Sequence, residues 1–336
     1  KMRAIGPNCV GVVDPYTGVD TFFLPRYKLE RPEEGSVAFI SQSGALGSVV
    51  LDWMAMKGYT ISKFISYGNA LDVDEADLTE YLASDPKTSV ICCYFEGLKQ
   101  GRKFYDTLKR VSGKKPVIII KGGRTEEGTQ AVSSHTGSLA GSREVHSAAF
   151  QQAGGIEART LEELFDFARV LATQPSPKGN RVQVITDGGG FGVLTTDWLI
   201  ESKLVMARMD RKTAASLKKA FPPHVVIKNP LDLTGDATVE RYHLAIDAAI
   251  HDPNVDMIAV IALFQIPTLT ADIVDVISAA SDRSSKPIIV ISAGGRFTEV
   301  LKKTLEDSGV PTFSYPEKAA RALKALYDFS EERKVK

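Results

Sequence analysis

The chain has 336 residues, of which 43% are hydrophobic and 24% charged, and its 41 Lys and Arg balance its 41 Asp and Glu. The length predicts two domains with full cores, and the zero formal net charge argues against a nucleic-acid partner. No apolar run approaches the roughly 20 residues that cross a bilayer, so no membrane partner is expected. Three cysteines without framework spacing indicate a reducing, cytoplasmic compartment, and the lack of a Cys or His ligand set predicts no metal in this chain.

Short apolar runs alternate with helix-length stretches along the chain. The helical stretches include residues 46–57 and 271–280. Continuous apolar strands that alternate with helices indicate parallel sheets covered on both faces, so an α/β fold is expected. The β-branched runs that predict strands are residues 37–40, 90–95, 117–120, 182–185, 257–263 and 288–291.

The second half of the chain repeats the first. Residues 37–61 align with residues 182–206 at a constant offset of 145 positions. We therefore predict two tandem doubly wound α/β domains at residues 35–173 and 180–330, separated by a linker that contains Pro and Ser. The aligned pairs include Gly44 with Gly189, Gly47 with Gly192 and Trp53 with Trp198.

Each copy has a glycine-containing turn between its first strand and its first helix. Free N–H groups and the positive end of the helix dipole make such turns anion sites, and glycine permits close approach of a ligand. Neither turn is a P-loop or a clean GxGxxG, and glycines that only shape a tight turn are the alternative. The candidate phosphate-binding residues are Ser43, Gly44 and Ala45 in the first copy and Gly189, Gly190, Phe191 and Gly192 in the second.

The first copy carries about 18 extra residues between Arg124 and Gly155, and an insertion in one copy of a duplicated scaffold is a place to look for function. This polar, loop-like stretch holds His135. A neutral imidazole can attack a phosphoryl group to give a covalent intermediate. Composition alone also allows a solvated histidine on a surface loop, so both interpretations stay open.

Glu96 directly follows the strand expected at residues 90–95, where the second copy has Leu263. A carboxylate at the carboxyl end of a parallel strand lies where such folds bind ligands, and it could hold one imidazole nitrogen while the other reacts. A capping or surface carboxylate is the alternative. Cys9, which follows Asn8, has no local histidine as a base, so we interpret it as structural or substrate-lining.

Taken together, these motifs resemble the ADP-forming acyl-CoA synthetases of the acetyl-CoA type, alpha-type region, in the succinyl-CoA ligase superfamily. The stretches that carry the resemblance, in the family's order, are residues 5–11, 41–47, 96–97, 134–138, and 187–197 with 229–233. The resemblance implies that His135 is the phosphorylated histidine and Glu96 its orienting carboxylate. It also implies that both glycine turns bind phosphate and that Asn8 and Cys9 border the CoA thiol and the acyl group.

The resemblance further implies two flavodoxin-like domains, the first with a phosphohistidine loop, after a remnant of a CoA-binding Rossmann domain and a linker at residues 1–34. The chain opens inside the motif that closes the CoA-binding domain, so we expect a piece of a larger protein. The implied partners are the missing CoA-binding domain and an ATP-grasp subunit or fused domain, in a homo- or hetero-oligomer. The implied substrates are CoA and ATP or ADP with Mg, with the nucleotide site outside this chain and no tightly bound cofactor.

The reaction that this resemblance implies converts acyl-CoA, ADP and phosphate into a free acid, CoA and ATP through a phosphohistidine. Two alternatives stay open. One is a catalytically silent regulatory or acyltransferase-associated relative of the same fold, and the other is a non-enzymatic binding module. Retention of His135 and Glu96 argues against a silent relative. Nothing in the sequence identifies the acyl group.

Overall fold

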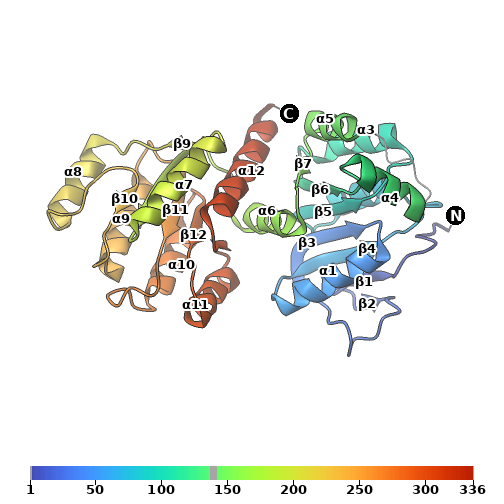
Figure 1. The fold of residues 1–336 in the computed structure, drawn as a ribbon, viewed down its shortest axis with the longest axis horizontal. Helices are drawn as coiled ribbons and strands as arrows, with labels where there is room; N and C mark the ends of the chain where they lie inside the picture. Colours follow the sequence, from blue (N-terminus) through green and yellow to red (C-terminus); the bar gives the residue numbers. More distant parts are fainter. Residues whose placement is uncertain (1, 137–141, 336) are drawn as a thin grey trace. The chain divides into compact units, whose positions relative to one another are not determined.

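The computed structural model describes residues 2–136 and 142–335. The chain divides into two compact units, one of residues 1–168 with 332–336 and the other of residues 169–331. Figure 1 shows the first unit mainly in blue and green and the second in yellow to red. Each unit contains one β-sheet with helices on its faces, which confirms the predicted α/β fold with two parallel-sheet domains.

The first unit has a seven-stranded sheet in the order β2-β1-β4-β3-β5-β6-β7. Neighbours from β4 to β7 are parallel, in the 2-1-3-4-5 order of a flavodoxin-like sheet, whereas β1 and β2 pair antiparallel at one edge. The strands are β1 (Val12–Asp14), β2 (Val19–Asp20), β3 (Glu34–Ser41), β4 (Ile61–Ser66), β5 (Val90–Phe95), β6 (Val117–Lys121) and β7 (Ile156–Glu157). The helices are α1 (Gly44–Met56), α2 (Glu75–Ser84), α3 (Gly101–Val111), α4 (Glu126–Thr136), α5 (Arg143–Ala153) and α6 (Leu161–Thr173), the last of which continues into the second unit from residue 169.

The central strands of the first unit are buried on both faces. Side chains of α2, α3 and α5, including Leu82, Phe104 and Phe150, pack on one face of the sheet. On the other face, Phe165 of α6 packs against Phe39 of β3, with the two rings tilted and their centroids 6.0 Å apart. This two-sided burial explains why the strands appear in the sequence as continuous apolar runs.

The sequence predicts no strand before residue 37, but β1 and β2 extend the first sheet at residues 12–20. Strands of two or three residues are too short to show a hydrophobic period, which is why the pattern missed them. The segment is bound to the sheet, since the Ser66 N–H donates to the Gly11 carbonyl at 3.0 Å.

The expected loop around His135 is wrong in part, because His135 lies in the last turn of α4. The helix begins after Thr125, whose Oγ1 accepts the Gly128 N–H at 3.0 Å, and Glu126 and Glu127 place negative charge in its first turn. Both features stabilise a helix N-terminus, and they outweigh the small polar residues that suggested a loop. The His135 side chain and residues 137–141 lie outside the described part of the structure.

The second unit has a parallel sheet in the order β10-β8-β11-β12-β13, with β9 also paired to β8. The short strands β9 and β10 together occupy the position that β4 holds in the first unit. The strands are β8 (Arg181–Thr186), β9 (Val205–Met206), β10 (Leu231–Asp232), β11 (Met257–Ile261), β12 (Ile288–Ile291) and β13 (Thr312–Phe313). The helices are α7 (Gly189–Glu201), α8 (Arg211–Ala220), α9 (Val239–His251), α10 (Ile273–Arg283), α11 (Arg296–Asp307) and α12 (Pro316–Val335).

Candidate functional site

A cavity of about 400 Å³ lies at the carboxyl ends of β3, β4 and β5 in the first unit. In a doubly wound sheet this is the topological switch point, where ligands bind. We call it the switch-point cavity. The turns that follow the three strands form it together with two segments from residues 8–23. Its lining residues are Asn8, Cys9, Val10, Phe23, Gln42, Ser43, Gly44, Ala45, Gly68, Asn69, Glu96 and Lys99.

The structure brings the predicted site residues of the first unit other than His135 into this one cavity. They come from three stretches of sequence that are far apart. The side chain of His135 lies outside the described part of the structure. The predicted residues that line the cavity are Asn8, Cys9, Ser43, Gly44, Ala45 and Glu96. Their roles in binding and catalysis stay predictions.

The segment that carries Asn8 and Cys9 is held by backbone hydrogen bonds from the turn after β4. The Asn69 N–H donates to the Pro7 carbonyl at 2.9 Å. Gly68 has a positive φ of 56°, and a Cβ atom there would lie 2.2 Å from the Asn8 carbonyl oxygen. Only glycine allows both the backbone conformation and this close approach, so Gly68 sets the position of the segment.

The start of α1 forms another wall of the cavity. Ser43 is the N-cap, and its hydroxyl accepts the Leu46 N–H at 3.4 Å. The first N–H groups of a helix have no partner within the helix and point outward at its positive end. A Cβ at Gly44 would lie 2.7 Å from Cγ1 of Val10, so glycine lets Val10 close against the turn.

Glu96 is a buried carboxylate, with 7% of its surface exposed. The N–H groups of Glu96 and Gly97 both donate to Oε1 of Gln42, at 2.6 and 3.0 Å. The Tyr94 hydroxyl donates to Oε1 of Glu96 at 3.4 Å, and burial together with the Glu96 charge raises the pKa of Tyr94 to about 12. Tyr94 therefore stays a neutral donor, and the carboxylate is held in place with capacity to accept a further hydrogen bond.

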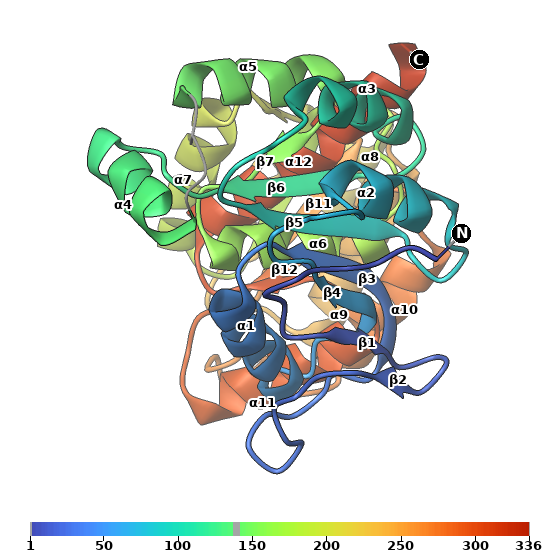
Figure 2. The same ribbon diagram turned by 90° about the vertical axis from the view of Figure 1, so that its right-hand side faces the viewer.

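The segment that leads to α4 begins beside Glu96. The Gly122 N–H donates to the Phe95 carbonyl at 2.7 Å, and Nζ of Lys121 donates to the Glu96 carbonyl at 2.8 Å. Burial lowers the pKa of Lys121, and the Glu96 charge opposes that shift. In Figure 2, α4 lies beyond the end of β6, away from the body of the first sheet. The helix that contains His135 therefore leaves the sheet at the edge where Glu96 lies.

The predicted turn of the second unit is also a helix start. The N-cap of α7 is Gly188, which forms no side-chain cap. Two carboxylates lie next to this turn. Asp187 accepts the Leu263 N–H at 3.0 Å, and Oδ2 of Asp232 would lie 3.1 Å from a Cβ at Gly189. Burial raises the pKa of Asp187 to about 6, although the hydrogen bond from Leu263 lowers it. The residues predicted to bind phosphate here, all in the first turn of α7, are Gly189, Gly190, Phe191 and Gly192.

Sequence reasoning missed Gln42 and Lys99 as cavity residues. Gln42 had one usable signal, because its aligned partner Asp187 is also a polar residue directly before a helix start. Lys99 had none, since a lysine in a loop is usually a solvated surface residue.

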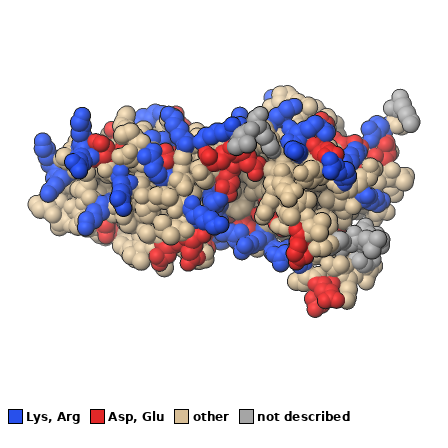
Figure 3. Space-filling view, turned by 90° about the horizontal axis from the view of Figure 1, so that it is seen from above, with Lys and Arg blue, Asp and Glu red and all other residues tan. Residues whose placement is uncertain are grey.

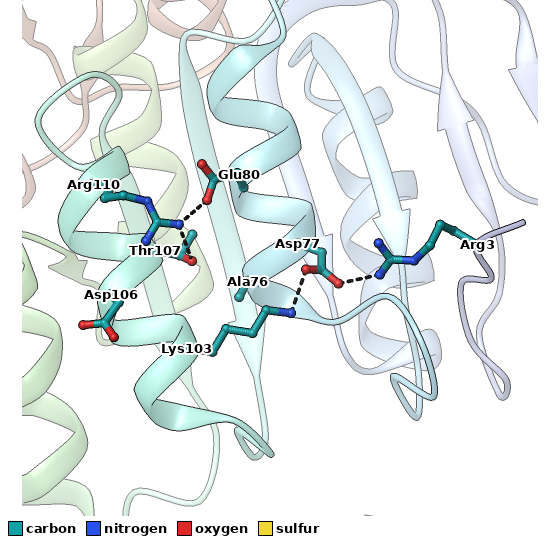
Figure 4. Close-up of a pocket in the computed structure, with 8 residues that line it drawn as sticks. All are labelled: Arg3, Ala76, Asp77, Glu80, Lys103, Asp106, Thr107 and Arg110. Atoms are coloured by element: carbon teal, nitrogen blue, oxygen red, sulfur yellow. Dashed lines mark hydrogen bonds and ion pairs between the residues drawn. The ribbon is translucent and has the colours of Figure 1, made fainter. Parts of the chain in front are cut away.

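A second hollow lies between α2 and α3, but its charges neutralise one another. Figure 4 shows Arg3 and Lys103 both bonded to Asp77, and Arg110 bonded to Glu80. On the face shown in Figure 3, Lys and Arg side chains are likewise interspersed with those of Asp and Glu.

Within residues 2–136 and 142–335, no group of three or more His, Cys, Asp or Glu could hold a metal ion. No helix in the same ranges is long and apolar enough to span a membrane.

Comparison with known protein families gives two matches. A model described as the succinyl-CoA ligase like flavodoxin domain matches residues 34–171. A model described as the ligase-CoA domain matches residues 182–334.

Similar proteins include the alpha subunit of Pyrococcus furiosus acetate–CoA ligase (ADP-forming) II. It is 42% identical over 97% of this chain, which covers 71% of the relative. The 4-hydroxybutyrate–CoA ligase (ADP-forming) of Nitrosopumilus maritimus is 32% identical over 98% of this chain, which covers 47% of that protein. Acetyl-coenzyme A synthetase 1 of Ca. Korarchaeum cryptofilum, solved in complex with phosphate and ADP, superposes with a TM-score of 0.90 at 37% identity. That match covers 99% of this chain and 72% of the other.

These comparisons confirm the resemblance found in the sequence motifs and the expected enzyme class, a ligase that forms carbon–sulfur bonds. The chain belongs to the ADP-forming acyl-CoA ligases of the succinyl-CoA ligase superfamily, and it corresponds to their alpha-subunit region.

Proposed function

We propose that the chain carries a phosphoryl group on His135 while acyl-CoA, ADP and phosphate are converted to a free acid, CoA and ATP. The switch-point cavity carries the proposal. It places the start of α1, the buried carboxylate of Glu96 and the Asn8–Cys9 segment around one volume. A helix start suits a phosphate ion, and a buried carboxylate suits an imidazole. The attack of phosphate on the thioester and the transfer of the phosphoryl group to His135 could therefore share this volume.

In the first step, an oxygen of phosphate attacks the thioester carbon and the CoA thiolate leaves, which yields an acyl phosphate. The N–H groups at the start of α1 orient the phosphate, and Asn8 and Cys9 border the thioester. In the second step, an imidazole nitrogen of His135 attacks phosphorus and the carboxylate of the acid leaves. In the third, a terminal oxygen of ADP takes the phosphoryl group and restores the free imidazole.

Glu96 acts in the second and third steps by accepting the N–H of the other imidazole nitrogen. That bond fixes the reactive tautomer and stabilises the positive charge that develops on the ring. Two features support this role: the backbone N–H of Glu96 is fixed by its bond to Gln42, and the segment to α4 begins next to Glu96.

The third step needs parts outside this chain. The similar proteins are alpha subunits or longer single chains, of which this chain covers 71% and 46–49%, respectively. We propose that an ATP-grasp unit, as a subunit or a fused domain, supplies the nucleotide site with Mg²⁺. A CoA-binding domain ahead of residue 8 supplies the rest of the thioester site. We propose that the start of α7 is the second phosphate-binding helix start and that it binds the phosphoryl group when His135 transfers it to ADP.

The test is ATP formation by the complete enzyme, that is, this chain with its CoA-binding and ATP-grasp parts. ATP should form only when acetyl-CoA or another acyl-CoA, ADP and phosphate are all present. Glu96→Gln should lower the rate by about 100-fold or more, the range for positioned acid–base groups. Glu80→Gln on α2, outside the switch-point cavity, is the matched control and should keep the rate. Full activity of Glu96→Gln would contradict the role of the carboxylate.

A further inference from the structure

We infer that Lys99 binds the phosphoryl group in the switch-point cavity, as the cation among its lining residues. The inference rests on the proposed function and adds a binding residue that no motif indicated. It names one ligand class, a phosphate ion or the acyl phosphate formed from it.

A phosphate bound in the cavity would need a positive charge beside it, and the lining contains one. Among the described residues that line the cavity, Glu96 and Lys99 are the only two with charged side chains. Glu96 is buried, and the ammonium of Lys121 behind it, outside the cavity lining, offsets part of its negative charge. The carboxylate still faces the cavity and repels a phosphate dianion placed beside it. The partial charge of one helix start is smaller than the charge of either group. Lys99 alone, among the described lining residues, supplies a full positive charge.

Lys99 lies in the same anchored loop as Glu96. Both residues lie in the loop between β5 and α3, where the Gly97 N–H donates to Oε1 of Gln42 at 3.0 Å. Nζ of Lys99 donates to the backbone carbonyl of Asn69, another lining residue, at 2.6 Å. The long side chain is therefore directed along the cavity wall.

Lys99 keeps its charge available for a ligand. Its hydrogen-bond partner among the described residues is a carbonyl oxygen, and no described carboxylate lies within ion-pair distance of it, although its charge acts on the buried carboxylate of Glu75 at longer range. Lys103, one helical turn further, differs, because its Nζ contacts Asp74 at 2.8 Å and Asp77 at 2.6 Å. An ammonium has three N–H donors, so two remain on Lys99 for phosphate oxygens.

The test measures the steady-state kinetics of the complete enzyme in the direction of ATP formation. In Lys99→Met, we expect the KM for inorganic phosphate to rise by about tenfold, a factor equivalent to about 1.4 kcal/mol, with a smaller change in kcat. The KM values for ADP and acetyl-CoA should change little. Lys99→Arg should restore most of the phosphate affinity, because it keeps the charge. Lys109→Met, which removes an exposed charge of α3 outside the cavity, should behave as wild type.

Three results would overturn the inference: an unchanged KM for phosphate in Lys99→Met, a rise in the KM for acetyl-CoA instead, or an equal phosphate defect in Lys109→Met. A rise for acetyl-CoA alone would assign Lys99 to a phosphate of CoA. Failure of the proposed function looks different, because wild-type enzyme would then form no phosphohistidine from ATP. Lys99→Met should still form it, since that reaction needs no phosphate ion.

Discussion

The turns that join β3 to α1 and β8 to α7 are built from the same hydrogen bonds. Oγ of Ser41 donates to the Ser43 carbonyl at 2.7 Å, and Oγ1 of its aligned partner Thr186 donates to the Gly188 carbonyl at 2.9 Å. The next residue in each turn, Gln42 or Asp187, accepts an N–H from the end of the neighbouring strand. The internal repeat of the sequence is therefore also a repeat of bonds.

The two turns differ where side chains face a ligand. The N–H that Gln42 accepts belongs to Glu96, whereas the one that Asp187 accepts belongs to Leu263. In the first unit, a neutral amide holds the strand end and a carboxylate stands beside the cavity. In the second unit, the carboxylate holds the strand end and the neighbouring side chain is apolar. The shared bonds reflect the common fold. The different position of the carboxylate, beside the cavity in the first unit and on the strand end in the second, is what the proposed hydrogen bond from His135 to Glu96 requires.

The comparison predicts that Asp187 lowers the stability of the second unit near neutral pH, whereas Gln42 has no such effect. The pKa of Asp187 is raised from 3.8 to about 6, so between these values the folded state keeps a proton that the unfolded state has released. The free energy of unfolding should therefore fall as pH rises from about 4 to about 6 and then level off. Asp187→Asn, which keeps an oxygen to accept the Leu263 N–H, should remove this fall and raise the free energy of unfolding at pH 7.5 by about 2 to 3 kcal/mol.

The measurement is urea unfolding at pH 4 and pH 7.5, monitored by a signal from the second unit. Asp197→Asn is the matched control, because Asp197 is exposed on α7. Equal effects of the two substitutions, or no gain for Asp187→Asn at pH 7.5, would break the comparison.

A smaller difference is expected at the paired glycines Gly47 and Gly192. A Cβ at Gly47 would lie 2.7 Å from Cζ of Phe64, which is fully buried, whereas a Cβ at Gly192 would lie 3.1 Å from Cγ2 of Thr186. Gly47→Ala should overpack the first core and cost about 1 to 3 kcal/mol. Gly192→Ala should cost less, because the gain in helix propensity, up to about 1 kcal/mol, offsets a milder contact.

Chemical denaturation of each single variant tests this difference. The ratio of the two losses is the informative quantity, since both substitutions add one methyl group at the fourth residue of a helix. A loss at Gly192→Ala equal to or larger than that at Gly47→Ala would contradict the packing difference between the units.

Much of the sheet framework could be predicted because central strands are continuous β-branched runs. The strand expected at residues 90–95 coincides with β5, and the one at 288–291 with β12. The strand expected at residues 257–263 ends earlier, at Ile261, because the Leu263 N–H turns to the Asp187 side chain. Strands of two or three residues, such as β2 and β13, have no period that a sequence pattern could reveal.

Site residues could be predicted where comparison of the two sequence copies drew attention to a residue type with a known chemical role. Glu96 stood out because the second copy has leucine at its position, and the glycine turns stood out because they occur twice. Gln42 was missed because its bonds reach residues 54 and 55 positions away, and Lys99 because its partner is a backbone carbonyl. The helical state of His135 was missed because local composition favoured a loop, whereas a capped helix start six to ten residues earlier decides it.

The most direct test of the central claim is to add ATP labelled in its terminal phosphate to the complete enzyme and to locate the label. The account predicts acid-labile, base-stable label on this chain. His135→Ala should abolish the label, whereas His146→Ala should keep it, since the His146 ring of α5 contacts the backbone carbonyl of Ser142. Label that persists in His135→Ala, or label that disappears in His146→Ala alone, would contradict the claim that His135 carries the phosphoryl group.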